Sequence, residues 1–267
     1  NPTDASNYNF TDRTDVNGNM PFAGRPDAFE VYARFTPGTA KAAADAEQEQ
    51  PALQGRVQLI LHKDAAYHDP EIAEMADEKV GSANVLIPAT EEWTKFTGEF
   101  SYATDEAPEV QYLLASATTT PVPGASKDDQ LDLDELCLIY YSTLKDLQID
   151  GKTIEGFSPE KTEYTIESDN ADLLNTITFE KKGVGASVEK NVDLTNNVCT
   201  ITVYGNDYDV NPANKTVYTV KLTHTTSIGS VSADNAANHK TYTIGGVRTD
   251  KPAAGLYIVD GKKKVVK

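Results

Sequence analysis

The alternation of hydrophobic and polar residues along the chain predicts a series of short β-strands. Residues 27–35 hold two interleaved sets with a period of two, which is typical of a strand with one buried face. The hydrophobic set is Phe29, Val31, Ala33 and Phe35, and the other set is Glu30, Tyr32 and Arg34. We expect the first set to lie in a core. The second set is either solvated or the floor of a binding surface.

A second alternating run, residues 56–62, predicts another half-buried strand. Its inward set is Val57, Leu59 and Leu61, and its outward set includes Gln58 and His62. Further strands are expected at residues 92–102, 109–115 and 131–140. Trp93, the only tryptophan, lies in the first of these three, where it either packs in the core or stacks on a ligand.

One short helix is expected over Pro70–Val80. Asp69 would cap its N-terminus and Pro70 would fit its first turn, because proline has no N–H that needs a partner there. Residues 39–50 are rich in Ala, Glu and Gln but have no apolar stripe, so they predict an exposed insertion.

Two strand patterns meet without a linker in residues 131–151. The first, with leucines at 131, 133, 136 and 138, is an interrupted alternation that predicts a closing strand. The second leads into Asp150-Gly151, which favours a tight hairpin turn because glycine tolerates positive φ. A chain of 267 residues can hold two domains, so we place them at 1–143 and 144–225, with a boundary near Thr143.

The second domain shows about seven short strands, a pattern typical of a small immunoglobulin-like sandwich. The remaining segment, 226–267, contains two short strands, GLYIV and KVVK, on either side of a basic turn. It is too small to fold alone, so it would dock, pair with a partner's sheet edge, or stay mobile. The fold class expected is all-β, with two antiparallel sandwiches.

The net charge is distributed unevenly along the chain, and it limits the kinds of molecule that the protein is expected to bind. The net charge is −17, and residues 1–143 hold 25 acidic against 9 basic residues, whereas residues 226–267 hold 3 against 7. An acidic surface repels phosphate backbones, so nucleic acid is not expected as a partner.

No apolar run approaches the ~18 residues that span a bilayer, so no transmembrane segment is expected. The chain starts at Asn1 without a signal-like run, so a secretion signal would have been removed or would lie outside this sequence.

Metal and thiol chemistry is weakly indicated. His62 and His68 have no neighbouring cysteine or third histidine, so the zinc pattern is absent. Asp132 and Asp134 lie on one face of the expected closing strand, where either solvation or a structural calcium ion is reasonable. Cys137 and Cys199 are expected as buried free thiols, and an interdomain disulfide would need Cα atoms within about 7 Å.

Three segments resemble known families. PFAGRPDAFEVYARFTPG (21–38), RVQLIL, EEWTKF and LDLDELCLIY resemble the PCMD carbohydrate-metabolism domain of secreted Bacteroidetes proteins. That resemblance covers most of residues 1–143 and implies a jelly-roll sandwich that binds glycans, with calcium as a structural ion. Residues 144–166 resemble the start of cadherin-like or immunoglobulin-like spacer sandwiches. Residues 241–267 resemble a C-terminal segment common on secreted or surface proteins of the same bacteria.

The function expected is therefore non-catalytic glycan binding, in a secreted or cell-surface protein with other surface components as neighbours. The expected ligand-binding side chains are Tyr32, Arg34, Gln58, His62, Tyr67 and Trp93. One alternative is a glycoside hydrolase, which would need two carboxylates flanking the scissile bond. The 41 acidic residues do not single out a pair, and the densest candidates are Asp132, Asp134 and Glu135. The other alternative is a structural or adhesive surface protein without a site. No nucleophile elbow, phosphate loop or zinc motif is present.

Overall fold

The structure is a computed structural model that describes residues 9–10, 19, 21–38, 54–63, 66–104, 111–119, 128–223, 240–259 and 261–266. The predicted all-β class is confirmed, because strands supply most of the regular structure and the helical segments are short 3-10 turns. Residues 1–224 form one compact unit and residues 225–267 form a second. The expected insertion at residues 39–50 lies outside the described residues.

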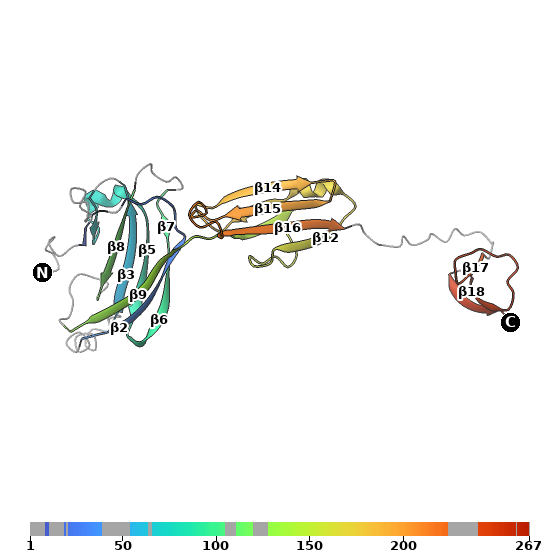
Figure 1. Cartoon of the computed structure of the whole chain (residues 1–267), viewed down its shortest axis with the longest axis horizontal. Helices are drawn as coiled ribbons and strands as arrows, with labels where there is room; N and C mark the ends of the chain where they lie inside the picture. The colour runs from blue at the N-terminus through green and yellow to red at the C-terminus, as the bar shows by residue number, and fades with distance from the viewer. Residues whose placement is uncertain are drawn as a thin grey trace. The chain divides into compact units, whose positions relative to one another are not determined.

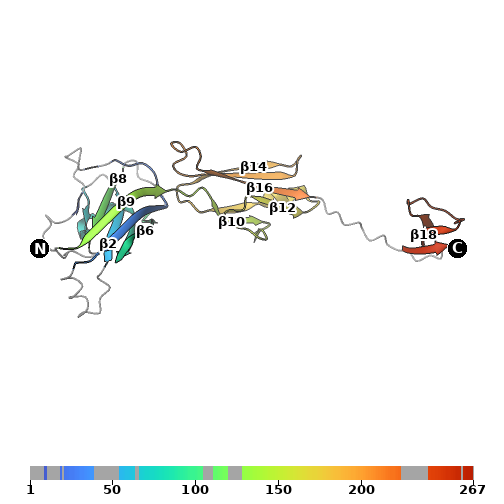
Figure 2. The same cartoon turned by 60° about the horizontal axis from the view of Figure 1, so that its bottom comes forward.

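The N-terminal part of the first unit is a sandwich of two antiparallel sheets (Figures 1 and 2). One sheet has the order β6-β2-β9, with β2 at Ala28–Thr36, β6 at Thr90–Glu99 and β9 at Gln130–Ile139. The other has the order β7-β5-β3-β8, with β3 at Gln54–His62, β5 at Lys79–Pro88, β7 at Ser101–Tyr102 and β8 at Tyr112–Thr118. Two further short strands, β1 (Asn9–Phe10) and β4 (His68–Asp69), form a separate antiparallel pair.

The core between these two sheets comes from the inward positions that the alternation predicted. Its fully or almost fully buried members are Phe29, Val31, Ala33, Phe35, Val57, Leu59, Ala83 and Ile87. The prediction of the inward sets of β2 and β3 is therefore confirmed. One face of each sheet is used for this core, which leaves each sheet with an outer face.

The outer face of the β3 sheet is covered by the chain between β3 and β5. Tyr67 is fully buried there and packs with Ile60 and Leu114, with Met75 at the margin. His62, predicted to face outward on an accessible binding surface, is also fully buried and stacks with the rings of Tyr67 and Tyr112. The outward orientation was right, but the inference of exposure was wrong because another segment packs over that face.

The predicted helix is shorter and differently built than expected. It is a 3-10 segment, η2, at Ala73–Glu78. Asp69 lies in β4 rather than at the helix N-cap, and the N-cap is Ile72, whose side chain makes no capping bond. Asp69 instead binds Arg56, which explains why it is not available as a cap.

The C-terminal part of the first unit is a second two-sheet arrangement. Three strands follow the order β11-β10-β13, at Lys152–Thr153, Leu144–Ile149 and Thr178–Lys181. Four strands follow the order β12-β16-β15-β14, at Glu163–Glu167, Lys215–Thr223, Val198–Tyr204 and Ser187–Asp193, and a 3-10 turn, η3, lies at Ala171–Thr176. Asp150 and Gly151 have φ values of 50° and 72°, so the predicted tight hairpin between β10 and β11 is confirmed.

The strand directions of this second sandwich and the exposure of one cysteine differ from the predictions. β12 and β16 run parallel, so the sandwich is not wholly antiparallel. The long chain between these two strands permits this, because parallel neighbours need an extended connection.

Both cysteines are free, as predicted, but only Cys199 is buried, whereas Cys137 is exposed on β9. Burial raises the pKa of the Cys199 thiol.

The two sandwiches of the first unit have separate hydrophobic clusters and share polar contacts at their junction. The Asp27 carboxylate accepts hydrogen bonds from the backbone N–H groups of Tyr141 (2.6 Å) and Val184 (2.7 Å). The Arg25 N–H donates to the side-chain oxygen of Asn206. Desolvation raises the pKa of Asp27 in spite of these two donors. Because residues 1–224 form one compact unit, the domain boundary near Thr143 stays a prediction.

The second unit is a three-stranded antiparallel meander in the order β17-β18-β19. Its strands are Thr241–Thr243, Gly255–Val259 and Lys262–Val266. Across the described parts of the whole chain, no helix has the length and apolar character needed to cross a membrane.

Candidate functional site

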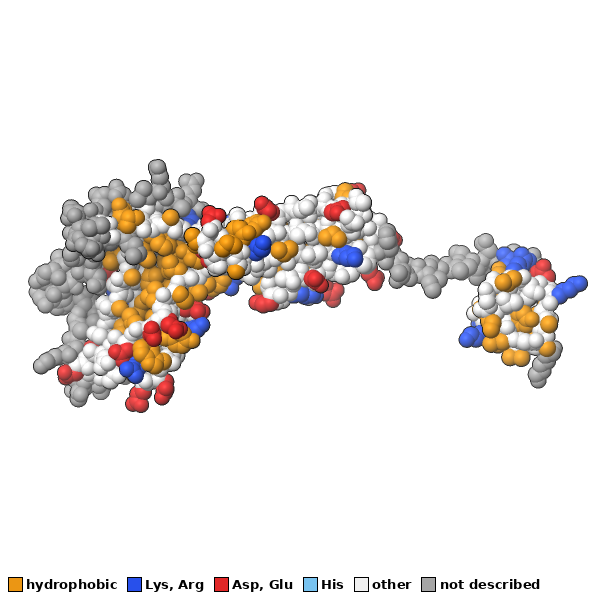
Figure 3. All heavy atoms as spheres, in the orientation of Figure 1, with side chains coloured by type: hydrophobic (Ala, Val, Ile, Leu, Met, Phe, Trp, Pro, Cys, Tyr) orange, Lys and Arg blue, Asp and Glu red, His pale blue; other side chains and the backbone are white. Residues whose placement is uncertain are grey.

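The outer face of the β6-β2-β9 sheet gathers aromatic and charged side chains from three strands. Tyr32 on β2 lies opposite Lys95 on β6 and opposite Asp134 on β9. Arg34, two residues further along β2, lies opposite Asp132. Figure 3 shows hydrophobic, acidic and basic side chains side by side over the lower end of β2 and β6. The alternation that places Phe29, Val31, Ala33 and Phe35 in the core therefore also places Tyr32 and Arg34 on this outer face.

An open depression lies on this face. Its volume is about 280 Å³, and it is lined by Tyr32, Trp93, Asp134 and Glu135. The Trp93 residue is 44% exposed, which favours the ligand-stacking alternative over a core role. The volume is just below the ~300 Å³ lower end of small-molecule pockets, so the depression suits one ring-sized group at a time.

A bulge in β9 positions the two carboxylates of the depression. Glu30 pairs with Cys137 and Tyr32 pairs with Asp134, so Glu135 and Leu136 together face Val31. Glu135 has a φ of 49°, a left-handed conformation that a regular strand does not contain. Bulges turn a side chain away from regular alternation, and here the result is that Asp134 and Glu135 line the same depression.

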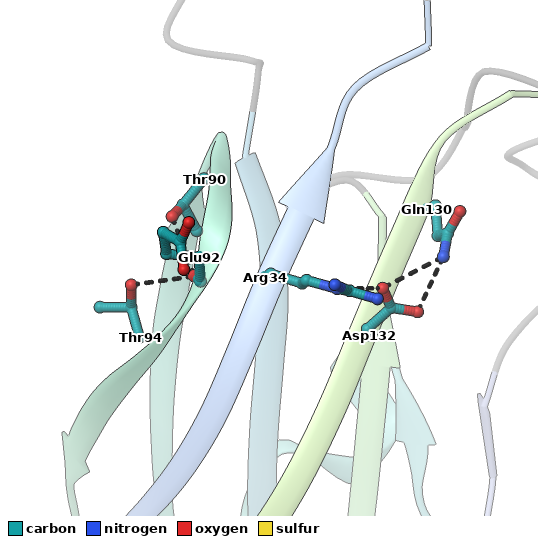
Figure 4. Close-up of polar contacts among 6 residues, drawn as sticks. All are labelled: Arg34, Thr90, Glu92, Thr94, Gln130 and Asp132. Atoms are coloured by element: carbon teal, nitrogen blue, oxygen red, sulfur yellow. Dashed lines mark hydrogen bonds and ion pairs between the residues drawn. The ribbon is translucent and has the colours of Figure 1, made fainter.

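A second irregularity, in β6, positions Trp93. Ala33 pairs with Thr94 and Phe35 pairs with Thr90, so three β6 residues, 91–93, lie opposite Arg34 alone. The hydroxyl groups of Thr90 and Thr94 both donate to the backbone carbonyl of Glu92, each at 3.1 Å (Figure 4). These bonds satisfy the Glu92 carbonyl, and they hold the segment from which Trp93 projects.

Arg34 links the aromatic and acidic parts of the face. Its Nε donates to the Asp132 carboxylate at 2.7 Å, and its guanidinium lies 5.0 Å from the centre of the Trp93 ring. The Gln130 amide also donates to both Asp132 oxygens, at 2.9 and 3.1 Å (Figure 4). The hydrogen bond from Gln130 and then the contact with Arg34 hold the pKa of Asp132 below its ordinary value.

Lys95 has a matching role on the other side of Tyr32. Its ammonium binds the Glu30 carboxylate at 2.9 Å and lies 5.8 Å from the centre of the Tyr32 ring. The hydrogen bond to Glu30 raises the pKa of Lys95. Both cations of this face are therefore paired with carboxylates and stand beside the aromatic rings.

The structure brings together three of the six predicted ligand-binding residues. Tyr32, Arg34 and Trp93 share the outer face of the β6-β2-β9 sheet, together with Asp132 and Asp134, which had been assigned to a metal. Gln58 and His62 are on β3, in the other sheet, so the predicted grouping with Tyr32 does not form. Tyr67, predicted at the rim, is buried under that other sheet, and its hydroxyl donates to the Glu71 carboxylate.

Lys95 was not predicted for the site, and Glu135 was named only with Asp132 and Asp134, as the densest acidic group for the hydrolase alternative. For Glu135 the sequence did hold a signal: the leucines at 131, 133, 136 and 138 break their alternation between 133 and 136. An extra residue in an alternating run is what a bulge requires. Lys95 had no comparable signal, since only the strand register places it opposite Tyr32.

The calcium prediction for Asp132 and Asp134 has no added support. Among the described residues there is no group of three or more His, Cys, Asp or Glu side chains that could hold a metal ion. Asp132 is engaged by Arg34 and Gln130. Calcium prefers several oxygen ligands, so backbone carbonyls of the N-terminal loop would have to complete the coordination shell. Most of that loop lies outside the described residues, so calcium binding stays a prediction.

Comparison with known proteins gives little further information. No protein-family model matches the chain, and no curated protein sequence matches it. A crystal structure of a "putative glycoside hydrolase" from Bacteroides thetaiotaomicron is similar, with a TM-score of 0.33 and 16% identity over 46% of this chain and 40% of that chain. The chain thus spans well under half of that protein. A similarity of this size does not establish a shared fold, and membership of the PCMD family stays a prediction.

Proposed function

We propose that the first sandwich is a non-catalytic glycan-binding module whose site is the depression on the outer face of the β6-β2-β9 sheet. The observation that supports this most is the presence of Tyr32 and Trp93 together at one exposed depression with two carboxylates. In line with the resemblance to secreted proteins, we place the protein outside the cell or on its surface, where polysaccharides are available.

The chemistry of the lining suits a sugar ring. The faces of Tyr32 and Trp93 offer apolar contact to the C–H face of a sugar, at about 25 cal/mol per Å² of area removed from water. Asp134 and Glu135 accept hydrogen bonds from hydroxyl groups, and each such bond to a charged acceptor contributes about 1.5–3 kcal/mol after the loss of a bond to water. The rings therefore supply the apolar contact area, and the carboxylates orient the sugar.

The arrangement is less suited to hydrolysis. A glycoside hydrolase needs two carboxyl groups on opposite sides of a bond, roughly 5 Å apart for retention or 6.5–9.5 Å for inversion. Asp134 and Glu135 are consecutive on one strand, and Asp134 accepts a hydrogen bond from the Glu135 N–H at 2.9 Å. They therefore approach a ligand from the same side, which favours binding over cleavage.

A glycan array tests this proposal, followed by affinity measurements for the bound glycans with wild type and Tyr32→Ala. The substitution should weaken binding at least tenfold, or about 1.4 kcal/mol, with an unchanged circular dichroism spectrum. Tyr204→Ala is the matched control, because Tyr204 is a half-buried tyrosine on a strand of the second sandwich. It should leave affinity unchanged.

Two outcomes contradict the proposal. Equal affinity of Tyr32→Ala and wild type would remove this face as the site. Release of reducing ends from the bound polysaccharides would favour the hydrolase alternative, and the absence of any bound glycan would favour a structural or adhesive role.

A further inference from the structure

Some carboxylates on the outer face of the β6-β2-β9 sheet have a basic ion-pair partner, and others do not. Asp132 is paired with Arg34, and Glu30 is paired with Lys95. Within the described part of the chain, neither Asp134 nor Glu135 has a Lys, Arg or His partner at ion-pair distance. Two carboxylates without an ion-pair partner therefore line the depression itself.

A ligand that contacts the two rings must lie close to both of these carboxylates, because all four residues line the same small space. At about 5 Å and an effective dielectric constant between 20 and 80, one like charge is enough to change an affinity severalfold or more. Two carboxylates together should therefore reduce the affinity for a negatively charged sugar by at least about tenfold at low salt.

The two cations of the face do not offset this effect. Arg34 and Lys95 are each bound to a carboxylate, at 2.7 and 2.9 Å. The charge of each cation is therefore already offset by a carboxylate. A uronic acid or a sulfate that approached either pair would meet an exposed and nearly neutral ion pair, so the added attraction would be small.

We infer that Asp134 and Glu135 are specificity-determining residues, and that the depression accepts glycans without negative charge and rejects those that carry uronic acids or sulfates. This inference rests on the proposed function, since it names the class of glycan that the same site takes. A neutral sugar can donate its hydroxyls to both carboxylates, whereas an acidic sugar meets like charge.

The test uses matched probes that differ only in charge. Hexasaccharides of cellulose, β-1,4-mannan and β-1,4-galactan are compared with the same oligosaccharides oxidised to uronic acids at their primary hydroxyls. For each neutral form that wild type binds, the oxidised form should bind at least tenfold more weakly at about 20 mM salt, and the difference should shrink at about 500 mM.

The double variant Asp134→Asn, Glu135→Gln should reduce that discrimination to about threefold or less, because amide side chains remove the charge and keep hydrogen-bonding oxygens. The amide oxygen introduced at position 134 can still accept from the N–H of residue 135, so the bulge should persist. The control is Glu163→Gln, Glu167→Gln, which removes two exposed carboxylates from β12 in the second sandwich and should keep the full discrimination.

Several outcomes would overturn the inference. Equal binding of neutral and oxidised forms by wild type would do so, as would undiminished discrimination in the Asp134/Glu135 double variant. If Tyr32→Ala weakens binding at least tenfold in either case, the proposed function stands and only the charge selection fails. If none of the six probes binds and the glycan array shows no bound glycan, the inference fails together with the proposed function; if the glycans bound on the array are acidic, only the inference fails.

Discussion

The two outer faces of the first sandwich carry similar side chains but differ in what covers them. On β2 the outward positions include Tyr32 and Arg34, and they form an open face with a depression. On β3 the outward positions include Arg56 and His62, and they are overlaid by the segment that carries Tyr67 and Asp69. The alternation on each strand predicted a set of outward side chains, and residues from both sets were expected to bind a ligand.

The difference is sharpest in a pair of arginine–aspartate contacts. Arg56 and Asp69 are 2.5 Å apart with side chains that are 14% and 3% exposed. Arg34 and Asp132 are 2.7 Å apart with side chains that are 42% and 29% exposed. The first pair lies among buried residues and anchors β4 to the sheet. The second remains accessible, so it can hold the geometry of a binding face without contributing much to stability.

Removal of a ring from each face should give the largest contrast. Tyr67→Ala should lower the free energy of unfolding by about 3–5 kcal/mol, because it leaves a cavity beside His62 under the covered face. Tyr32→Ala should lower it by less than about 1 kcal/mol, because its ring is partly in water already. Urea unfolding followed by circular dichroism measures both.

Tyr67→Phe controls for the lost hydroxyl, which donates to Glu71. It should cost only about 1 kcal/mol. Equal destabilisation by Tyr67→Ala and Tyr32→Ala would show that the two faces do not differ in the way described.

The two acidic partners should give a smaller but still clear contrast. Asp69→Asn leaves Arg56 with an uncompensated charge in a mostly buried site, so we expect a loss of about 3 kcal/mol in unfolding free energy. Asp132→Asn acts on an exposed pair, and its unfolding curve should overlay that of wild type. Coincident curves for wild type and Asp69→Asn would contradict the assignment of a structural role to the buried pair.

These comparisons also show what the sequence could and could not predict. A period of two is a local property, so the strands and their inward residues, such as Val31 and Leu59, could be predicted from the sequence. Whether an outward residue meets water depends on a distant segment packing over it. His62 is the clearest case, because nothing in residues 56–62 indicates that Tyr67 will cover it.

The candidate site was predictable to the same extent. Tyr32 and Arg34 could be placed on one face of one strand from the alternation alone. Their neighbours Lys95 and Asp134 depend on the register between strands, which the alternation does not determine. The bulge that adds Glu135 was visible as an interrupted leucine pattern, but its consequence for the site needed the sheet around it.

The smallest expected effect concerns the titration of Asp132. Its pKa is held below the ordinary value of 3.8, first by the hydrogen bond from Gln130 and then by Arg34. The resulting stabilisation is complete above pH 3.8 and is lost as the pH falls through the lowered value. Because the pair is exposed, this should barely move the unfolding midpoint. Carboxyl NMR shifts should nevertheless show the low pKa directly, and Gln130→Ala and Arg34→Gln should each raise it toward 3.8. An Asp132 that titrates at or above 3.8 in the wild type would mean that the Gln130–Asp132–Arg34 contacts are not maintained in solution, and that the open face is less ordered than the covered one.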